Sequence, residues 1–283
     1  MTTETPAHVE YDDDPALSAT GLRGFTLPLS PSGRTSLFPP PPWDYSAEML
    51  VVDFTADRER LARYLPTGLV PTAEGGASFG FGRWSAGADA DPRMKADPAR
   101  GQHDEAYLLI HAMMGEKKVG FLAFSWVSTE LSQIRGLVQG FPKKLGAAYI
   151  SRPVELGRGG PQRQPGHTLH AHVNSMNRRL ATASVKLDTA EPEGFVPPPA
   201  TIPHLYLRMF PTLAPAESPV LELSTLTLRD VEVGSAYSGD AELEFGESEY
   251  EELAELGPIQ AGRGYHYWYA MTILEGSVVP LES

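Results

Sequence analysis

Two adjacent lysines, Lys143 and Lys144, are the residues of this sequence with the most distinctive potential for chemistry. They stand in the apolar, Gly- and Pro-framed segment 140–146, although the chain has only six lysines in 283 residues. A buried ammonium group is costly, so a lysine that leaves water tends to lose its proton and its pKa falls. The neutral amine attacks ketones, so this pair predicts a lysine that forms an imine with a keto substrate.

Only one of the two lysines can serve this chemistry. If the chain is extended after Pro142, Lys143 and Lys144 point to opposite faces, and one alone enters a pocket. The same dipeptide recurs at Lys117-Lys118, after Gly115-Glu116, in a predicted hairpin turn where both side chains are expected in water. On residue types alone, an exposed pair at a strand start is the alternative reading of Lys143-Lys144.

The run Gln139-Gly140-Phe141-Pro142-Lys143-Lys144-Leu145-Gly146 resembles the lysine signature of the acetoacetate decarboxylase family. Weaker similarities extend the resemblance from about Trp43 to near the C-terminus, at Asp104-Glu105-Ala106-Tyr107, residues 179–183, residues 203–211 and the Gly239 region. The resemblance implies a cone-shaped β-barrel with a few flanking helices, assembled into homo-oligomers. It also implies catalysis with no metal and no organic cofactor.

The resemblance assigns the imine to Lys143 and leaves Lys144 to tune its neighbour's electric field or to stay in water. Glu105 aligns with an acidic residue of the family's pocket and precedes an apolar strand, which would desolvate it and raise its pKa. We therefore predict Glu105 as the proton shuttle, with a surface carboxylate at a strand start as the alternative. His103 and Asp104 beside it are expected in a loop, where His103 could titrate near neutrality.

Substrate binding is where the chain departs from the family. The resemblance places a carboxylate-binding arginine shortly before the first core strand, where this chain has Ala47-Glu48. The resemblance also implies an Arg-Glu pair ahead of the lysines, and the matching positions in this chain are Gly136 and Leu137. Arg135 and Gln139 are the candidate replacements, and Phe141 is the third predicted substrate-binding residue.

A protonated imine accepts the electron pair released when a carboxylate or a neighbouring proton leaves, so the lysine alone does not select one reaction. The first hypothesis is a carbon–carbon lyase that decarboxylates a small 3-keto acid of the acetoacetate type. One alternative is aldol condensation, dehydration or cyclisation of a larger 2-keto acid through the same imine. A non-catalytic barrel that binds a small molecule is the other.

The hydrophobic pattern predicts an α+β fold that is mainly β. A hairpin joins the apolar runs 106–114 and 119–127, and a helix capped by Ser128 or Thr129 follows and ends before Pro142. Helices are also predicted at 56–65 and between a Ser248/Glu251 capping box and Gly257, and residues 91–102 read as a loop. Further strands are expected at 49–54, 147–154, 168–173, 180–187, 206–210, 220–228 and 265–274.

Composition limits the compartment and the partners. The net charge of −13 and the pI of about 5.0 disfavour nucleic acid and anionic membranes as partners. With no cysteine, there is no disulfide framework and no thiolate site, and no secretory signal is evident. We predict a cytoplasmic protein with a flexible, Pro-rich arm over residues 1–42 and a single domain over 43–283.

Three other motifs in the sequence could suggest a different chemistry. The G-x-S-x-G match at Gly76–Gly80 is not followed by a helical pattern, so we predict that it does not form a nucleophile elbow. His170 and His172 share a strand face and could ligate a metal, but an exposed strand edge explains them better. Tyr265, Tyr267, Trp268 and Tyr269 are predicted to pack in the core, with one tyrosine hydroxyl available to line the pocket.

Overall fold

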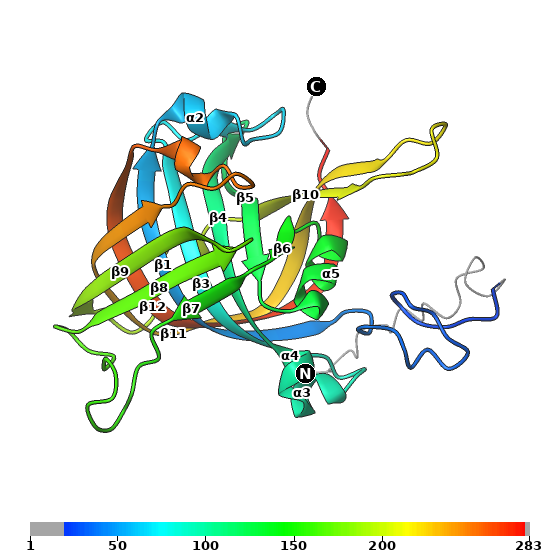
Figure 1. Ribbon diagram of the computed structural model, residues 1–283, viewed down its shortest axis with the longest axis horizontal. Coiled ribbons are helices and arrows are strands. Elements are labelled where there is room, and N and C mark those ends of the chain that lie inside the picture. Colours follow the sequence, from blue (N-terminus) through cyan, green and yellow to red (C-terminus); the bar gives the residue numbers. More distant parts are fainter. Residues whose placement is uncertain (1–19, 281–283) are drawn as a thin grey trace, which may run out of the picture.

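The structure is a computed structural model that describes residues 20–280, and strands dominate it, as predicted (Figure 1). Its strands are β1 (Trp43–Ala56), β2 (Val70–Pro71), β3 (Gly76–Gly87), β4 (Gln102–Met114), β5 (Lys117–Val127), β6 (Lys143–Leu145), β7 (Ala147–Ile150), β8 (Thr168–Ser175), β9 (Arg178–Ala190), β10 (His204–Phe210), β11 (Val220–Phe245) and β12 (Ile259–Val278). Its helices are α2 (Arg58–Ala62), α3 (Arg93–Ala96), α4 (Pro98–Gly101) and α5 (Glu130–Gln139), with the 3₁₀ helices η2 (Pro198–Ala200) and η3 (Leu253–Leu256).

Seven strands close into a ring in the order β10–β5–β4–β3–β1–β12–β11, because β10 pairs with both β5 and β11. The pairing of β10 with β5 is parallel, and the other neighbours around the ring are antiparallel. Strands β9, β8 and β7 continue the sheet from β11 and cross in front of the ring in Figure 1. The strongly curved, closed sheet implied by the family resemblance is thus what the chain forms.

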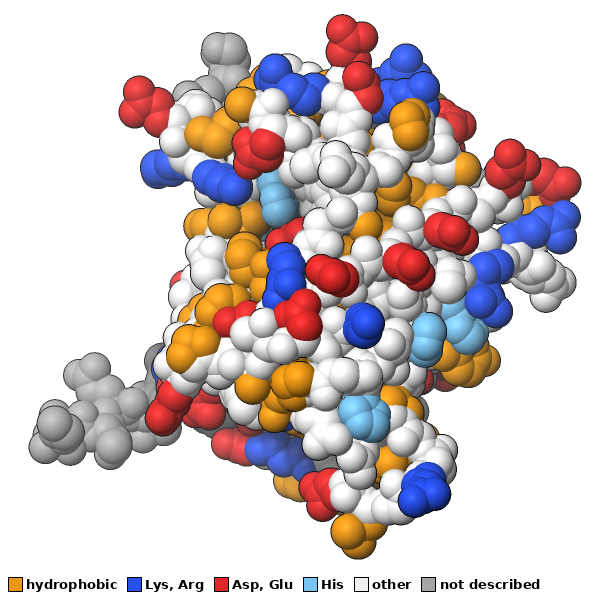
Figure 2. Space-filling model, turned by 90° about the vertical axis from the view of Figure 1, so that its left-hand side faces the viewer, with side chains coloured by type: hydrophobic (Ala, Val, Ile, Leu, Met, Phe, Trp, Pro, Cys, Tyr) orange, Lys and Arg blue, Asp and Glu red, His pale blue; other side chains and the backbone are white. Residues whose placement is uncertain are grey.

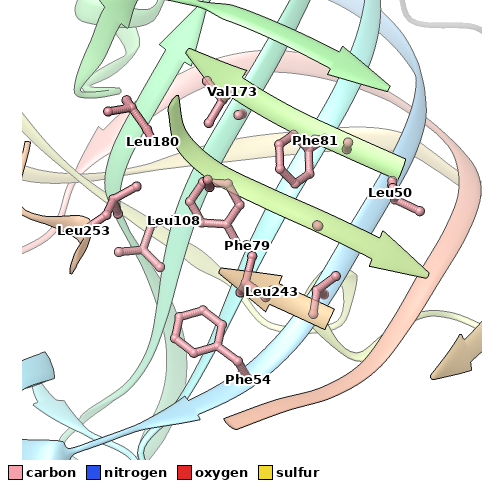
Figure 3. Packing of buried hydrophobic residues seen from close by; sticks show 14 of the residues in the cluster. Leu50, Phe54, Phe79, Phe81, Leu108, Val173, Leu180, Leu243 and Leu253 are labelled. Carbon is pink, nitrogen blue, oxygen red and sulfur yellow. The ribbon is translucent and has the colours of Figure 1, made fainter. Parts of the chain in front are cut away.

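The main hydrophobic core lies on the outer side of the ring, between its strands and the layer of β8 and β9. Leu50, Phe79 and Leu108 come from β1, β3 and β4, and they pack in one buried cluster with Val173 and Leu180 (Figure 3). Fully burying a side chain of this size contributes about 1.5–3 kcal/mol. This core fixes β4 firmly, so the alternate residues of β4 are held on the other side.

The inner side of the ring is rich in aromatic residues. Met49, Trp84, Tyr107, Ala236 and Tyr267 belong to one cluster, and they come from five different strands of the ring. These strands are neighbours in the ring, and Met49 and Tyr107 directly precede Leu50 and Leu108, so the cluster lies on the face opposite to the main core. The aromatic packing predicted for the last strand is confirmed at Tyr267.

Several boundaries differ from the predictions. Two short helices, α3 and α4, occupy the segment 91–102 that was predicted as a loop, and β11 and β12 are much longer than expected. The capping box is wrong: the Ser248 hydroxyl accepts from the Tyr250 N–H, and only the short helix η3 follows. The Glu251 carboxylate instead accepts from the Trp126 indole, a tertiary contact that competes with local capping.

Part of the N-terminal segment packs beside the start of β1. Residues 1–19 of the predicted flexible arm lie outside the described residues. Phe38 is buried and contacts Phe25 and Trp43 through edge-to-face ring packing. The arm is therefore not free up to residue 42, because its aromatic residues cover the end of the ring that begins at Trp43.

On the face drawn in Figure 2, charge is mixed rather than segregated. Figure 2 shows the left-hand side of Figure 1, where acidic and basic side chains are interspersed with hydrophobic ones. Arg263 and Asp188, for example, form an exposed ion pair at 2.7 Å. Over residues 20–280, the structure contains no helix of the length and apolarity needed to cross a membrane.

Candidate active site

Helix α5 and strand β6 deliver Lys143 into the ring. The helix starts at the Thr129 hydroxyl, which accepts from the Ser132 N–H, and ends at Gly140, whose φ of 95° is left-handed. Glycine adopts this conformation at low cost, and Pro142 then keeps the chain extended. Strand β6 pairs in parallel with β5, with Lys143 opposite Ser125. Lys143 is only 6% exposed.

Gly136 makes room for the Lys143 side chain. A Cβ atom added at Gly136 would lie 2.2 Å from Lys143 Cδ, far inside the contact distance of two carbon atoms. The lysine stem therefore runs directly over the helix backbone at this point. A side chain at this position of α5 would displace the Lys143 stem from the path it takes here, and the sequence reading did not anticipate this contact.

The Lys143 amine is enclosed by polar contacts. Its Nζ donates to Glu105 Oε2 at 3.0 Å and to Ser132 Oγ at 3.2 Å, and it lies 5.1 Å from the centre of the Phe141 ring. Glu105 Oε1 accepts from the Ser125 hydroxyl at 2.7 Å. We call Lys143, Glu105, Ser125 and Ser132 the lysine site. The predicted pairing of Lys143 with Glu105 in one enclosed place is what the structure contains.

Burial and charge shift the two ionisable groups of the lysine site. Burial lowers the pKa of Lys143 below its ordinary 10.5, the Glu105 charge opposes this, and the Arg135 charge adds to it. Burial alone would raise the pKa of Glu105, as predicted from the sequence. The Lys143 charge, with the neighbouring His103 and the hydrogen bond from the Ser125 hydroxyl, instead brings it to about 2. The resting site therefore holds an ionised carboxylate in direct contact with the Lys143 amine.

Two predicted substrate-binding residues lie on the same face of α5 as Ser132. Arg135 and Gln139 are 3% and 7% exposed. The Gln139 amide donates to the Tyr45 hydroxyl at 3.3 Å, and the Arg135 guanidinium lies 5.1 Å from the centre of the Tyr45 ring. Within residues 20–280, Arg135 takes part in no ion pair. A buried guanidinium without an acidic partner is suited to bind an anion.

His103 is part of the same neighbourhood. It belongs to β4 rather than to the predicted loop, it is 6% exposed, and its Nε2 lies 3.7 Å from Glu105 Oε2. Its ring stacks on Trp84 at a centroid distance of 6.4 Å and an interplanar angle of 10°. Burial lowers the pKa of His103 to about 4, so the expected titration near neutrality is wrong for the resting site.

Lys144 lies outside the lysine site, although it was included among the predicted catalytic residues. Its side chain is 47% exposed, and its Nζ donates to Glu251 Oε2 at 2.6 Å. Glu251 also accepts from Trp126, whose indole belongs to the outer core. Lys144 therefore fastens β6 from the side opposite to Lys143.

The missing family arginine leaves a small residue inside the ring. Ala47 joins the inner cluster, whereas Glu48 is buried on the opposite face of β1. Glu48 accepts from Arg83 at 3.0 Å and contacts His266 at 2.9 Å. The acidic residue at this place thus has its own partners and does not enter the lysine site.

The remaining motifs fall outside the lysine site. Ser78 of the G-x-S-x-G match sits within β3, with no following helix, and bonds to Asp53 at 2.6 Å and His111 at 2.8 Å. His170 is exposed on β8, and His172 packs on Tyr149. No group of three possible metal-ligating side chains occurs among the described residues.

A surface cavity of about 540 Å³ is lined by Glu48, Arg83 and His103, together with further residues of β3, β4 and β7. Glu48 and Arg83 already bind each other there. Because His103 lines this cavity and lies 3.7 Å from Glu105, the cavity reaches the neighbourhood of the lysine site.

The comparisons with known proteins agree with this geometry. The family model described as acetoacetate decarboxylase (ADC) matches residues 26–281. The chain belongs to the acetoacetate decarboxylase family. No match was found among curated proteins.

Solved structures of this enzyme family are similar over nearly the whole chain. The enduracididine biosynthesis enzyme MppR, complexed with the condensation product of pyruvate and imidazole 4-carboxaldehyde, is 30% identical with a TM-score of 0.87, over 93% of this chain and 98% of that one. An acetoacetate decarboxylase-like enzyme from Sphingomonas wittichii RW1 is 28% identical with a TM-score of 0.82, over 91% and 100%. An acetoacetate decarboxylase at 19% identity and a TM-score of 0.73, over 91% and 95%, shares the fold.

Sequence reasoning missed Ser125, Ser132 and Gly136. A signal for two of them was present, because Ser132, Gly136 and Gln139 recur at the spacing of one helical face. Ser125 had no local signal, since only the pairing of β4 with β5 brings it to Glu105.

Proposed function

We propose that this protein forms an imine between Lys143 and a 2-keto acid of the pyruvate type, and condenses it with an aldehyde. The observation that carries the proposal is that Arg135 is buried and forms no ion pair with a carboxylate within residues 20–280. It stands with Gln139 on the helix face that also presents Ser132 to the Lys143 amine. A guanidinium and an amide are suited to hold a carboxylate beside the carbon that the amine attacks.

The lysine site supplies the steps of such a reaction. Glu105 takes a proton of the Lys143 ammonium group, and the neutral amine adds to the ketone. Glu105 returns this proton to the carbinolamine hydroxyl, which leaves as water and gives the iminium. Glu105 then removes a proton from the neighbouring methyl group, which leaves an enamine. The enamine carbon attacks the aldehyde, and loss of water from the adduct gives an unsaturated product that hydrolysis releases from Lys143.

The position of the substrate carboxylate decides which bond can break. In the imine of a 2-keto acid, breaking the bond to the carboxylate would leave the electron pair on the imine carbon itself, where the nitrogen cannot accept it. In a 3-keto acid, the same pair is conjugated with the iminium. A 2-keto acid bound in this way keeps its carboxylate and reacts at its methyl group. The similarity to MppR, whose complex contains a pyruvate condensation product, supports this choice.

Decarboxylation of a 3-keto acid is the second candidate, and family membership supports it. Borohydride reduction separates the two candidates, because it fixes the imine on Lys143 for mass spectrometry. We expect pyruvate to leave an adduct that retains its carboxyl group, and turnover with an aldehyde to release no carbon dioxide. Rapid carbon dioxide release from acetoacetate, with an adduct that has lost its carboxyl group and no adduct from pyruvate, would contradict the proposal.

Replacing the guanidinium tests the carboxylate receptor. Arg135→Gln is expected to raise KM for pyruvate about 10- to 100-fold, because a charged hydrogen bond contributes about 1.5–3 kcal/mol. The same variant should trap acetone, which has no carboxylate, as well as the parent protein does. An equal loss with both ketones would mean that Arg135 acts on the fold rather than on the carboxylate.

A further inference from the structure

His103 shares the proton-accepting oxygen of the lysine site. Its Nε2 lies 3.7 Å from Glu105 Oε2, the same oxygen that accepts from Lys143 Nζ at 3.0 Å. The other carboxylate oxygen is occupied by the Ser125 hydroxyl. A proton taken up by Glu105 therefore has two neighbours on one side, the lysine nitrogen and the imidazole.

His103 is held in place independently of Glu105. It lies in β4, paired with Trp84 across the strands, and its ring stacks on the Trp84 indole. It is as deeply buried as Lys143, at 6% exposed. A positioned, neutral imidazole with a carboxylate beside it is the usual arrangement of a group that carries protons.

The proposed reaction needs protons at two places, on the methyl-derived carbon and on the aldehyde-derived oxygen, and one carboxylate does not serve both. Carbon–carbon bond formation requires a proton at the aldehyde oxygen, and the dehydration requires one at the departing hydroxyl. This oxygen is borne by the carbon that came from the aldehyde, beyond the carbon from which Glu105 takes its protons. A second carrier next to Glu105 would reach it.

We propose that His103 is this second carrier, a catalytic residue that protonates the aldehyde-derived oxygen. This inference rests on the proposed function. In each half of the cycle, Glu105 takes one proton from the methyl-derived carbon and passes it to His103 Nε2. The imidazolium gives the first proton to the alkoxide as the carbon–carbon bond forms. It gives the second to the hydroxyl, which leaves as water while the carbon–oxygen bond breaks, so no proton is gained or lost.

Both groups of this relay are shifted in the resting site. Burial lowers the pKa of His103, whereas the Lys143 charge lowers that of Glu105 against the effect of burial. The buried tyrosines Tyr107 and Tyr206 are less suited to protonate the oxygen, because burial raises the pKa of each hydroxyl above its ordinary value and makes it a weaker acid. Burial and the Lys118 charge lower the pKa of His111, and its Nε2 is bonded to Ser78.

Product partition tests the proposal. His103→Gln keeps a polar side chain that cannot take up and release a proton. His103→Phe keeps only the stacking on Trp84. With pyruvate and an aromatic aldehyde, both variants should form dehydrated product about 100-fold or more slowly than the parent protein. Borohydride trapping of pyruvate and deuterium exchange of its methyl group should stay within about threefold. The exposed His170→Gln is the matched control and should change neither rate.

The outcomes separate this inference from the proposed function. If His103→Gln forms dehydrated product at the rate of the parent protein, the role of His103 as proton carrier is wrong. It is also wrong if trapping, exchange and dehydration fall equally in both variants, because that would indicate a structural role. If the parent protein itself forms no pyruvate adduct, the proposed function fails, and this inference fails with it.

Discussion

The chain contains the dipeptide Lys-Lys twice, and the two copies have opposite environments. Lys117 and Lys118 begin β5 at the hairpin turn, where both are exposed and Lys118 makes a loose contact of 3.5 Å with Glu74. Lys143 is enclosed by Glu105, Ser132 and Phe141, and Lys144 points away from it to Glu251. An identical pair of side chains thus lies in water in one place, whereas in the other its first amine is buried and hydrogen-bonded to a carboxylate, because the surrounding fold and not the local composition decides the environment of the amine.

The largest expected difference between the two pairs is in imine formation. Lys143→Ala should abolish borohydride trapping and lower turnover about 10⁴-fold or more, since it removes the nucleophile. Lys118→Ala should leave both unchanged and alter the free energy of unfolding by less than about 0.5 kcal/mol. Trapping by mass spectrometry, with peptide mapping of the adduct, checks both variants. An adduct that persists in Lys143→Ala would place the chemistry elsewhere.

The second prediction disturbs the path of the buried lysine without touching its charge. Gly136→Ala puts a methyl group 2.2 Å from Lys143 Cδ, so the lysine stem must shift by about an ångström or more and move the amine with it. A displacement of that size is expected to slow imine formation about 100-fold. Gly159→Ala is the matched control, because a Cβ atom there meets nothing within 4 Å and φ is not left-handed. Equal trapping rates in the two variants would show that the lysine has another route.

The third prediction concerns the pH at which the two kinds of lysine lose their protons. The amine attacks only when neutral, so the trapping rate should rise with pH, with a midpoint below 10.5, because burial lowers the pKa of Lys143. The Glu105 charge raises that pKa, so Glu105→Gln should move the midpoint to lower pH. Glu74→Gln, next to Lys118, should leave it in place. A midpoint that rises in Glu105→Gln would reverse the assigned electrostatics.

The smallest expected effect on imine formation is at the partner lysine. Lys144→Ala removes the cation that pairs with Glu251, whose side chain is only 3% exposed, so we expect a loss of about 1–3 kcal/mol in stability. Trapping at Lys143 should persist, with a pH midpoint close to that of the parent protein. Chemical denaturation and the trapping profile check these two points. A large shift of the midpoint would restore Lys144 to the role of tuning its neighbour's charge.

Sequence reasoning was most accurate where local rules act. The hairpin of β4 and β5, the helix capped by Thr129 and its end before Pro142 all follow from periodicity, capping and proline sterics. It failed at the Ser248 capping box, because Glu251 is used by Trp126 from β5. The length of β11 and β12 was also missed, since long bent strands follow the curvature of the ring rather than a local pattern.

Membership of the acetoacetate decarboxylase family and the identity of one reactive lysine were evident in the order of residues, because a short signature and a proline-set extended segment specify them locally. Placing Glu105, Ser125, Arg135 and Gln139 around that lysine required the closed ring. These side chains come from three separate elements, and only the pairing of β4 with β5 and the packing of α5 bring them together. Desolvation likewise belongs to the folded state, because the free energy of an amine depends on everything that surrounds it and not on its neighbours along the chain.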